Sequence, residues 1–156
     1  MLAAPAECHA PFRKVSHNPF LMPDGLQVNP EVLSLERLRA QAWQKVEPLY
    51  LDRLAKVVER YQVASSRKQG SEDLAQVAQA TMAGRVETLL VEADRVLPGR
   101  IDEATGQIEP GDLSHPEIGD VLDDLSEMVF RMKGEVVVVP TERMPVTTGV
   151  AATYRF

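Results

Sequence analysis

A run of four valines near the C-terminus constrains the fold more than any other feature of the sequence. Residues 135–140 read Glu-Val-Val-Val-Val-Pro, and consecutive β-branched side chains are typical of a buried strand. Residues 86–91 predict a second such strand. Between them, residues 114–134 predict a helix with capping-box spacing between Ser114 and Glu117 and a terminating Gly134. We therefore expect a right-handed crossover that joins two strands of one sheet.

A long amphipathic helix is predicted over residues 34–66, where apolar side chains recur every three or four positions. Pro48 lies in its middle and removes a backbone donor. We therefore expect either a kink or two helices that meet near Glu47, and we favour the kink. A second helix should follow, with Ser71 as its cap and Gly84 as its terminator.

Shorter elements complete the pattern. Residues 1–4 predict the end of a buried strand, and residues 6–15 predict a short helix. Because that strand needs neighbours, we expect the chain to be part of a longer protein. Residues 102–106 predict the turn of a small hairpin outside the main sheet, with a positive φ at Gly106. Residues 150–156 predict a closing strand, so the chain should form a mixed sheet with helices on its two faces.

Composition excludes several classes of protein. The 156 residues are 44% hydrophobic, which is enough for a sizeable core, and the net charge of −6 disfavours nucleic-acid binding unless cations gather locally. A single cysteine, Cys8, excludes an internal disulfide framework. The sequence has neither a signal peptide nor an uninterrupted apolar run long enough for a membrane span. We therefore expect a cytoplasmic protein with no membrane association.

One candidate chemistry pairs acidic residues of the 114–134 helix with a histidine, as a general acid and base. The residues concerned are Asp120, Asp123, Asp124 and Glu127, together with His9, His17 and His115. We favour a solvated acidic face, because paired catalytic carboxylates require burial that the sequence does not indicate. The histidines lack metal-ligand spacing, and no glycine-rich phosphate loop occurs, so we expect no metal and no cofactor.

Two segments are candidates for binding. A patch facing an anion would consist of Arg53, Lys56, Arg60, Arg67 and Lys68, and RNA contact there is one interpretation. The other segment is the loop at residues 141–149, with Glu142, Arg143, Met144 and Pro145 as the candidate interaction residues. It is either a rigid connection between strands or a recognition loop, since arginine and methionine are common at interfaces.

Several segments, taken in order, resemble the C-terminal domain of bacterial relatives of the archaeo-eukaryotic peptide-chain release factors. They are residues 84–92, 121–125, 134–140, 143–145 and 149–152. The resemblance covers about residues 71–156, and residues 2–5 and 12–16 look like the end of the middle domain of the same proteins. It divides the chain into a remnant of a preceding α/β domain at 1–33, a long connecting helix at 34–70 and a C-terminal α/β domain at 71–156.

The resemblance implies a three-layer α/β/α sandwich, akin to kink-turn RNA-binding ribosomal proteins, and a role around the ribosome. Release factors depend on a Gly-Gly-Gln loop, and this chain contains no Gly-Gly pair. We therefore expect a non-catalytic binding module with a ribosome, a translation-associated protein or RNA as partner. The alternatives are a hydrolase that uses the acidic helix and a structural module that forms a homodimer.

Overall fold

The computed structural model describes residues 1–102 and 105–156. They form two compact units, Met1–Leu54 and Ala55–Phe156. The boundary between the units falls inside α2 (Leu35–Ser66), which is continuous through Pro48. The interpretation of this segment as two helices is therefore wrong.

In the first unit, β1 (Ala3–Ala4) pairs in parallel with β2 (Leu26–Gln27), and α1 (Ala6–Val15) lies between them in the chain. The predicted short helix is confirmed, whereas the predicted N-terminal strand forms only at Ala3–Ala4 and is half-buried rather than buried.

His9 ties the two strands of this unit together. Its Nε2 lies 3.0 Å from the carbonyl oxygen of Ala4 and 3.1 Å from that of Leu26. Because both neighbours are acceptors, this nitrogen carries the proton and donates. A Cβ at Gly25 would lie only 2.6 Å from the imidazole Cε1, so glycine is needed beside the ring. The histidine therefore has a structural role in this unit.

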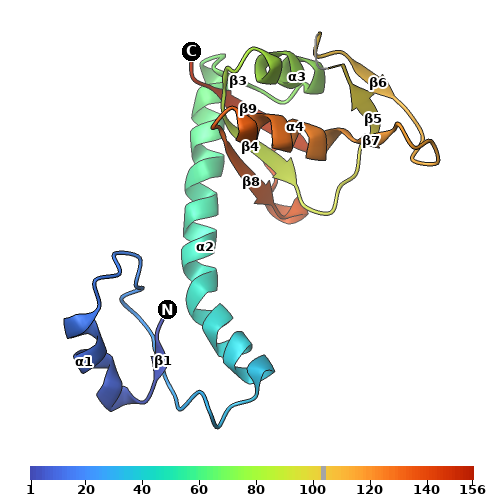
Figure 1. The fold of residues 1–156 in the computed structure, drawn as a ribbon. Helices are drawn as coiled ribbons and strands as arrows, with labels where there is room; N and C mark the ends of the chain where they lie inside the picture. The colour runs from blue at the N-terminus through green and yellow to red at the C-terminus, as the bar shows by residue number, and fades with distance from the viewer. Residues whose placement is uncertain (103–104) are drawn as a thin grey trace. The chain divides into compact units, whose positions relative to one another are not determined.

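The second unit is built on a sheet of order β3-β9-β4-β8 (Figure 1). Its strands are β3 (Gly70–Ser71), β4 (Val86–Glu92), β8 (Glu135–Val139) and β9 (Val150–Tyr154). The β4–β8 pair is parallel, as a crossover requires, whereas β9 runs antiparallel to both β3 and β4. The expected mixed sheet is confirmed.

Helices cover both faces of this sheet. On one face, α3 (Leu74–Met82) and α4 (Val121–Arg131) close a core that includes Val77, Leu89, Leu122, Leu125 and Val150. On the other, residues 55–66 of α2 bury Val57 and Tyr61, each 4% exposed. The predicted three-layer α/β/α sandwich is therefore confirmed.

The start of α4 differs from the prediction. The helix begins at Val121 rather than near Ser114, and its N-cap is Asp120. One carboxylate oxygen of Asp120 accepts from the backbone N–H of Leu122 at 3.1 Å and from that of Leu97 at 2.9 Å. Just before the helix, β7 (Gly119–Asp120) pairs with β5 (Pro98–Ile101). This strand pairing satisfies backbone groups that a longer helix would have used.

The cap of α3 is also two residues later than predicted. Asp73, not Ser71, caps this helix by accepting from the N–H of Gln76 at 2.8 Å. Ser71 belongs to β3, and its hydroxyl oxygen accepts from the N–H of Asp73 at 3.1 Å. The serine therefore supports the cap instead of forming it.

A small sheet of order β6-β5-β7 lies outside the central one. Here β5 and β6 (Ile108–Pro110) form the expected hairpin, and Gly106 has the expected positive φ of 69°. Two residues of the predicted turn, Glu103 and Ala104, lie outside the described residues.

The double role of Asp120 leads to a stability prediction. We expect Asp120→Ala to lower the free energy of unfolding by about 1–2 kcal/mol, because it leaves two backbone donors without their acceptor. Asp120→Asn keeps a side-chain oxygen and should retain most of that stability. Urea denaturation of the full chain measures both effects.

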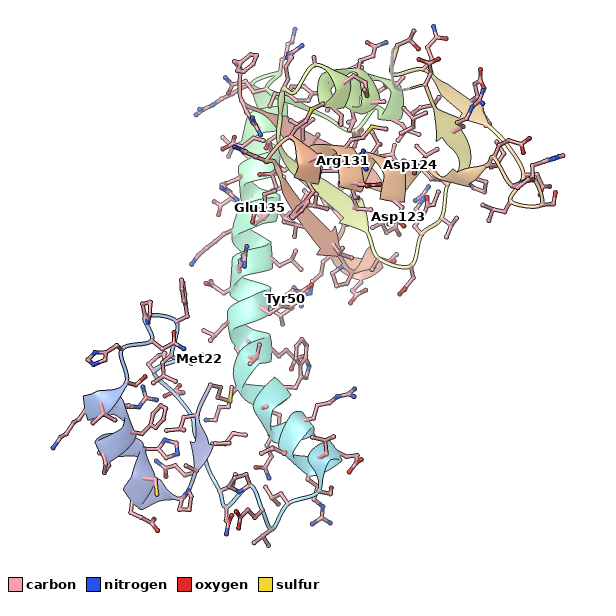
Figure 2. All side chains as sticks on the ribbon, in the orientation of Figure 1. Met22, Tyr50, Asp123, Asp124, Arg131 and Glu135 are labelled. Atoms are coloured by element: carbon pink, nitrogen blue, oxygen red, sulfur yellow. The ribbon has the colours of Figure 1, made fainter. Side chains whose placement is uncertain are left out.

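The matched control is Asp123→Ala, which removes an exposed carboxylate from the first turn of the same helix (Figure 2). It should cost no more than about 0.5 kcal/mol. Equal losses for Asp120→Ala and Asp123→Ala would contradict the capping role.

Candidate functional site

The carboxyl ends of the two parallel strands bring two loops together. The N–H of Ala93, just after β4, donates to the carbonyl oxygen of Val139 at the end of β8, at 2.8 Å. The N–H of Glu92 donates to the carbonyl oxygen of Gly149 at 2.9 Å. Ligands of open α/β sheets are commonly bound at such an edge. The predicted interaction loop therefore lies where this fold can present side chains to a partner.

Arg95 fastens that loop. Its guanidinium Nη1 donates to the carboxylate of Glu92 at 2.7 Å and to the carbonyl oxygen of Thr147 at 2.8 Å. Gly149 has a φ of 86°, and a Cβ there would lie 2.5 Å from the Cδ of Arg95. The positive φ favours glycine at this position, and a larger residue would also displace the Arg95 side chain. The loop is a fixed element held by one arginine from the neighbouring loop.

The loop turns its charged residues toward solvent. It contains η1 (Thr141–Arg143), a short 3-10 helix in which the N–H of Arg143 donates to the carbonyl oxygen of Pro140 at 2.8 Å. Glu142 and Arg143 are exposed, and Met144 is half-buried. Pro145 is also half-buried. The loop thus exposes the consecutive charged residues Glu142 and Arg143, which are followed by the half-buried Met144.

The contact with Arg95 also shifts the pKa of Glu92. The hydrogen bond from Arg95 lowers the pKa of Glu92 below its ordinary 4.5, partial burial opposes this, and a hydrogen bond with Thr141 adds to the lowering. The charged form is therefore favoured in the folded chain. Sequence reasoning missed this pair, although its i,i+3 spacing at the end of a predicted strand was available as a signal.

The predicted basic patch is divided. Arg53 lies in the unit Met1–Leu54, whereas Lys56, Arg60, Arg67 and Lys68 lie in Ala55–Phe156. Arg60 forms an ion pair with Glu135 on β8 at 3.5 Å, with side chains 60% and 37% exposed. Beyond the end of α2, Lys68 has a positive φ of 59°. Of the cations in the second unit, Arg60 and Arg67 line one surface hollow at the C-terminal end of the helix.

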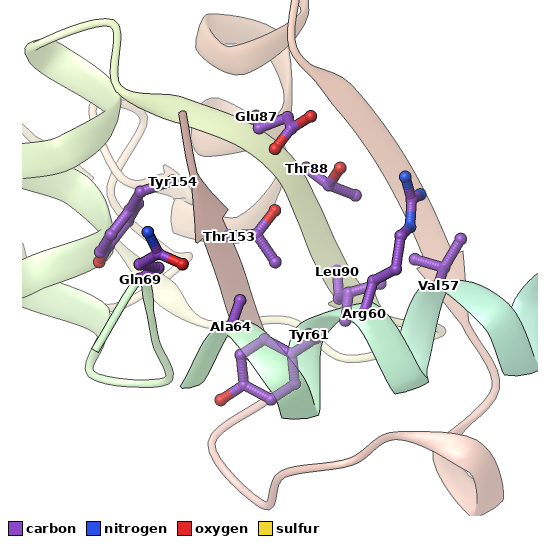
Figure 3. A pocket seen from close by; sticks show the side chains of 10 residues that line it. All are labelled: Val57, Arg60, Tyr61, Ala64, Gln69, Glu87, Thr88, Leu90, Thr153 and Tyr154. Atoms are coloured by element: carbon purple, nitrogen blue, oxygen red, sulfur yellow. The ribbon is translucent and has the colours of Figure 1, made fainter. Parts of the chain in front are cut away.

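A hollow of about 170 Å³ opens between this end of α2 and the sheet (Figure 3). It is lined by Val57, Arg60, Tyr61 and Ala64 of α2, by Gln69, and by Glu87, Thr88, Leu90, Thr153 and Tyr154 of the sheet. Burial raises the pKa of Tyr61, with a hydrogen bond to Ser65 acting in the opposite direction, so this phenol stays neutral. The threonines were a missed signal, because Thr88 and Thr153 are polar residues next to apolar ones in β4 and β9.

The acidic helix face is largely engaged in structural contacts. Besides the cap formed by Asp120, Glu127 forms an ion pair with Arg131 at 2.5 Å, one turn along α4. Asp123 and Asp124 stand in the first turn of the helix (Figure 2), and Asp123 is exposed. His115 is exposed in the segment before β7.

Across residues 1–102 and 105–156, no group of three or more histidine, cysteine or acidic side chains could hold a metal ion. Over the same residues, no helix combines the length and the apolar character needed to cross a bilayer.

Solved structures show which class of fold this is. The chain is similar to the C-terminal domain of peptide chain release factor from Methanosarcina mazei, with a TM-score of 0.57 and 18% identity over 78% of this chain and 93% of that one. It is also similar to Archaeoglobus fulgidus Pelota, with a TM-score of 0.50 and 22% identity. That match covers 85% of this chain but only 38% of Pelota. The fold is that of a release-factor C-terminal domain.

The family follows from the sequence comparison. The model of bacterial archaeo-eukaryotic release factor family 3 matches residues 1–85, which is more than half of the 156 residues. The chain belongs to this family, and the resemblance inferred from the sequence is confirmed. No curated protein sequence matches the chain.

The Glu92–Arg95 contact predicts a specific pH dependence. Because the folded pKa of Glu92 lies below its unfolded value, its contribution to stability is present above pH 4.5 and is lost as the pH falls through the lower folded value. We expect Glu92→Gln to be less stable than the original chain by a constant amount at neutral pH, and this difference should shrink below pH 4.5. Urea denaturation from about pH 3 to 8 measures it.

Glu87→Gln supplies the control, since Glu87 is an exposed carboxylate on the same strand. Its difference from the original chain should show no comparable decrease in acid. A Glu92→Gln difference that does not change with pH would refute the assigned contact.

Proposed function

We propose that this chain is the non-catalytic binding module of a translation-associated protein, with a ribosome, a translation factor or RNA as its partner. Membership of a release-factor family supports the translation link. The observation that carries the binding role is the loop fastened by Arg95, which holds Arg143 exposed at the carboxyl edge of the parallel strands. A fixed, charged loop binds at a lower entropic cost than one ordered on contact.

Two features support a non-catalytic role. The chain lacks the Gly-Gly pair of the loop on which release factors depend. In addition, Asp120 is held by two backbone donors and Glu127 by Arg131, so these carboxylates of the candidate hydrolase site already serve the fold. A general acid or base must instead be available to a substrate proton.

The proposal also assigns a role to each of three segments of the chain. Residues 1–33 belong to a preceding α/β domain, residues 34–70 connect, and residues 71–156 form the binding domain. The binding surfaces are the loop at Glu142–Pro145 in the binding domain and, at the end of the connecting segment, Arg60 of α2 with Arg67 and Lys68 just after that helix. A translation partner places the protein in the cytoplasm.

Co-sedimentation with ribosomes tests the proposal. We expect the full chain to pellet with ribosomes or subunits at low and moderate salt, about 50 and 150 mM. Arg143→Glu should reduce the bound fraction by roughly three- to tenfold, because it reverses an exposed charge at the interface. Absence of the original chain from the pellet at both salt concentrations would refute the ribosomal partner.

Arg131→Glu provides the matched control. This substitution makes the same charge change at an exposed arginine of α4, and it should leave co-sedimentation unchanged. An equal loss for Arg131→Glu and Arg143→Glu would show that total charge, not the loop, controls binding.

A homodimer is a second candidate, favoured by apolar side chains on the first half of α2. Leu35, Trp43 and Leu49 are 76%, 49% and 56% exposed, and exposed apolar patches often mark interfaces. If this face joins two copies, light scattering should give a dimer mass for the full chain and a monomer mass for Trp43→Ser. A monomer at every concentration would exclude the homodimer.

A further inference from the structure

Two hollows of the second unit meet at the C-terminal end of α2. The inner one, of about 170 Å³, lies between the helix and the sheet (Figure 3). The outer one, of about 330 Å³, lies along the helix surface. They share Arg60, Ala64 and Gln69. We call this pair of hollows the α2 groove.

The size of the inner hollow restricts what can enter it. Cofactor and drug-sized sites occupy about 300–1,000 Å³, so about 170 Å³ suits a single side chain. The walls include Val57, Tyr61 and Leu90, and polar groups at the sheet come from Thr88 and Thr153, which are 4% and 9% exposed. These surroundings fit an apolar or aromatic side chain.

The outer hollow adds positive charge and apolar surface. Arg60 and Arg67 both line it: Arg60 lies in α2, and Arg67 directly follows Ser66, the last residue of that helix. Val63 lies between them and is 45% exposed. The row of arginine, valine and arginine therefore presents two cations on either side of an apolar contact.

The present partner of Arg60 does not prevent a ligand from binding. Its ion pair with Glu135 is 3.5 Å long and largely exposed, and such surface pairs contribute little stability. A guanidinium has five N–H donors and can hold a second carboxylate. The rim also contains Glu59 and Glu87, which disfavour a ligand with uninterrupted negative charge.

We propose that the α2 groove binds an acidic segment of a protein partner, with one apolar side chain in the inner hollow and carboxylates paired to Arg60 and Arg67. This inference rests on the proposed binding function and names the partner chemistry of its basic surface.

A phosphate backbone fits the groove less well. Residues 55–156 carry 17 acidic and 11 basic side chains. This excess of negative charge opposes a long polyphosphate more strongly than a short acidic segment, whose few carboxylates can each pair with Arg60 or Arg67. Proteins that bind single-stranded nucleic acid also expose aromatic rings for base stacking. Of the two tyrosines that line the inner hollow, Tyr61 is only 4% exposed, and the ring of Tyr154 is already covered by the guanidinium of Arg85, 5.4 Å from its centroid.

NMR titration of the full chain with the peptide acetyl-Glu-Glu-Phe-Glu-Glu-amide tests the groove. We expect shifts of the backbone amides of Val63, Ala64 and Gln69, with a dissociation constant on the order of 10⁻⁴ M at low salt. Arg67→Glu should weaken binding about tenfold or more and should favour the same peptide with lysines in place of its glutamates. Replacing the phenylalanine by serine should also abolish most of the binding.

Arg131→Glu on α4 is the matched control and should leave peptide affinity unchanged. Shifts confined to other residues, or equal affinity for Arg67→Glu and the original chain, would overturn the proposal. It would also be overturned if an RNA of about 20 nucleotides shifted the groove amides while the peptide did not. Peptide binding by a chain that fails to co-sediment with ribosomes would refute the ribosomal partner but support the groove.

Discussion

Parallel pairing of β4 with β8 is the constraint on which the second unit depends. Leu89, Leu90 and Val91 face Val136, Val137 and Val138 in register, and a parallel pair can be joined only by a crossover. That crossover contains the small sheet and α4, so the helix must return across one face of the sheet. The same pairing places the carboxyl ends of β4 and β8 at one edge of the sheet, where Arg95 contacts the loop before β9. The pairing of β4 with β8 therefore determines the core, the order of the layers and the position of the candidate interaction loop.

The sequence predicted the elements whose residues repeat with a clear period. The four-valine strand, the long helix and the buried strand at residues 86–91 all have patterns that local propensity reinforces. Their order along the chain also indicated the family. The expectation that the four-valine strand is buried was wrong, because β8 lies at the edge of the sheet and its Val138 is 57% exposed. The starts of two helices were predicted too early, because Ser71 and Ser114 are residues of a type that often caps helices. Neither serine forms the cap in the structure. In each case an aspartate nearer the helix was the better-placed acceptor, and strand pairing took the preceding residues.

The candidate site was less predictable for a different reason. Arg143 could be selected from residue type alone, but its presentation depends on Arg95 and Gly149, which are far apart in the sequence. The α2 groove likewise needs residues from a helix and from two strands that meet only after folding. Long-range juxtaposition is not encoded in local periodicity, so a single sequence cannot reveal either surface.

Asp120 also has a consequence for how the domain opens. One carboxylate oxygen joins α4 to the backbone at Leu97, just before β5, so the first turn of the helix and the small sheet cannot separate without losing the same acceptor. Elements linked in this way tend to exchange with solvent as one cooperative unit. Local unfolding of this domain should therefore begin as a joint release of the small sheet and the helix start, while the β4–β8 pair retains its protection.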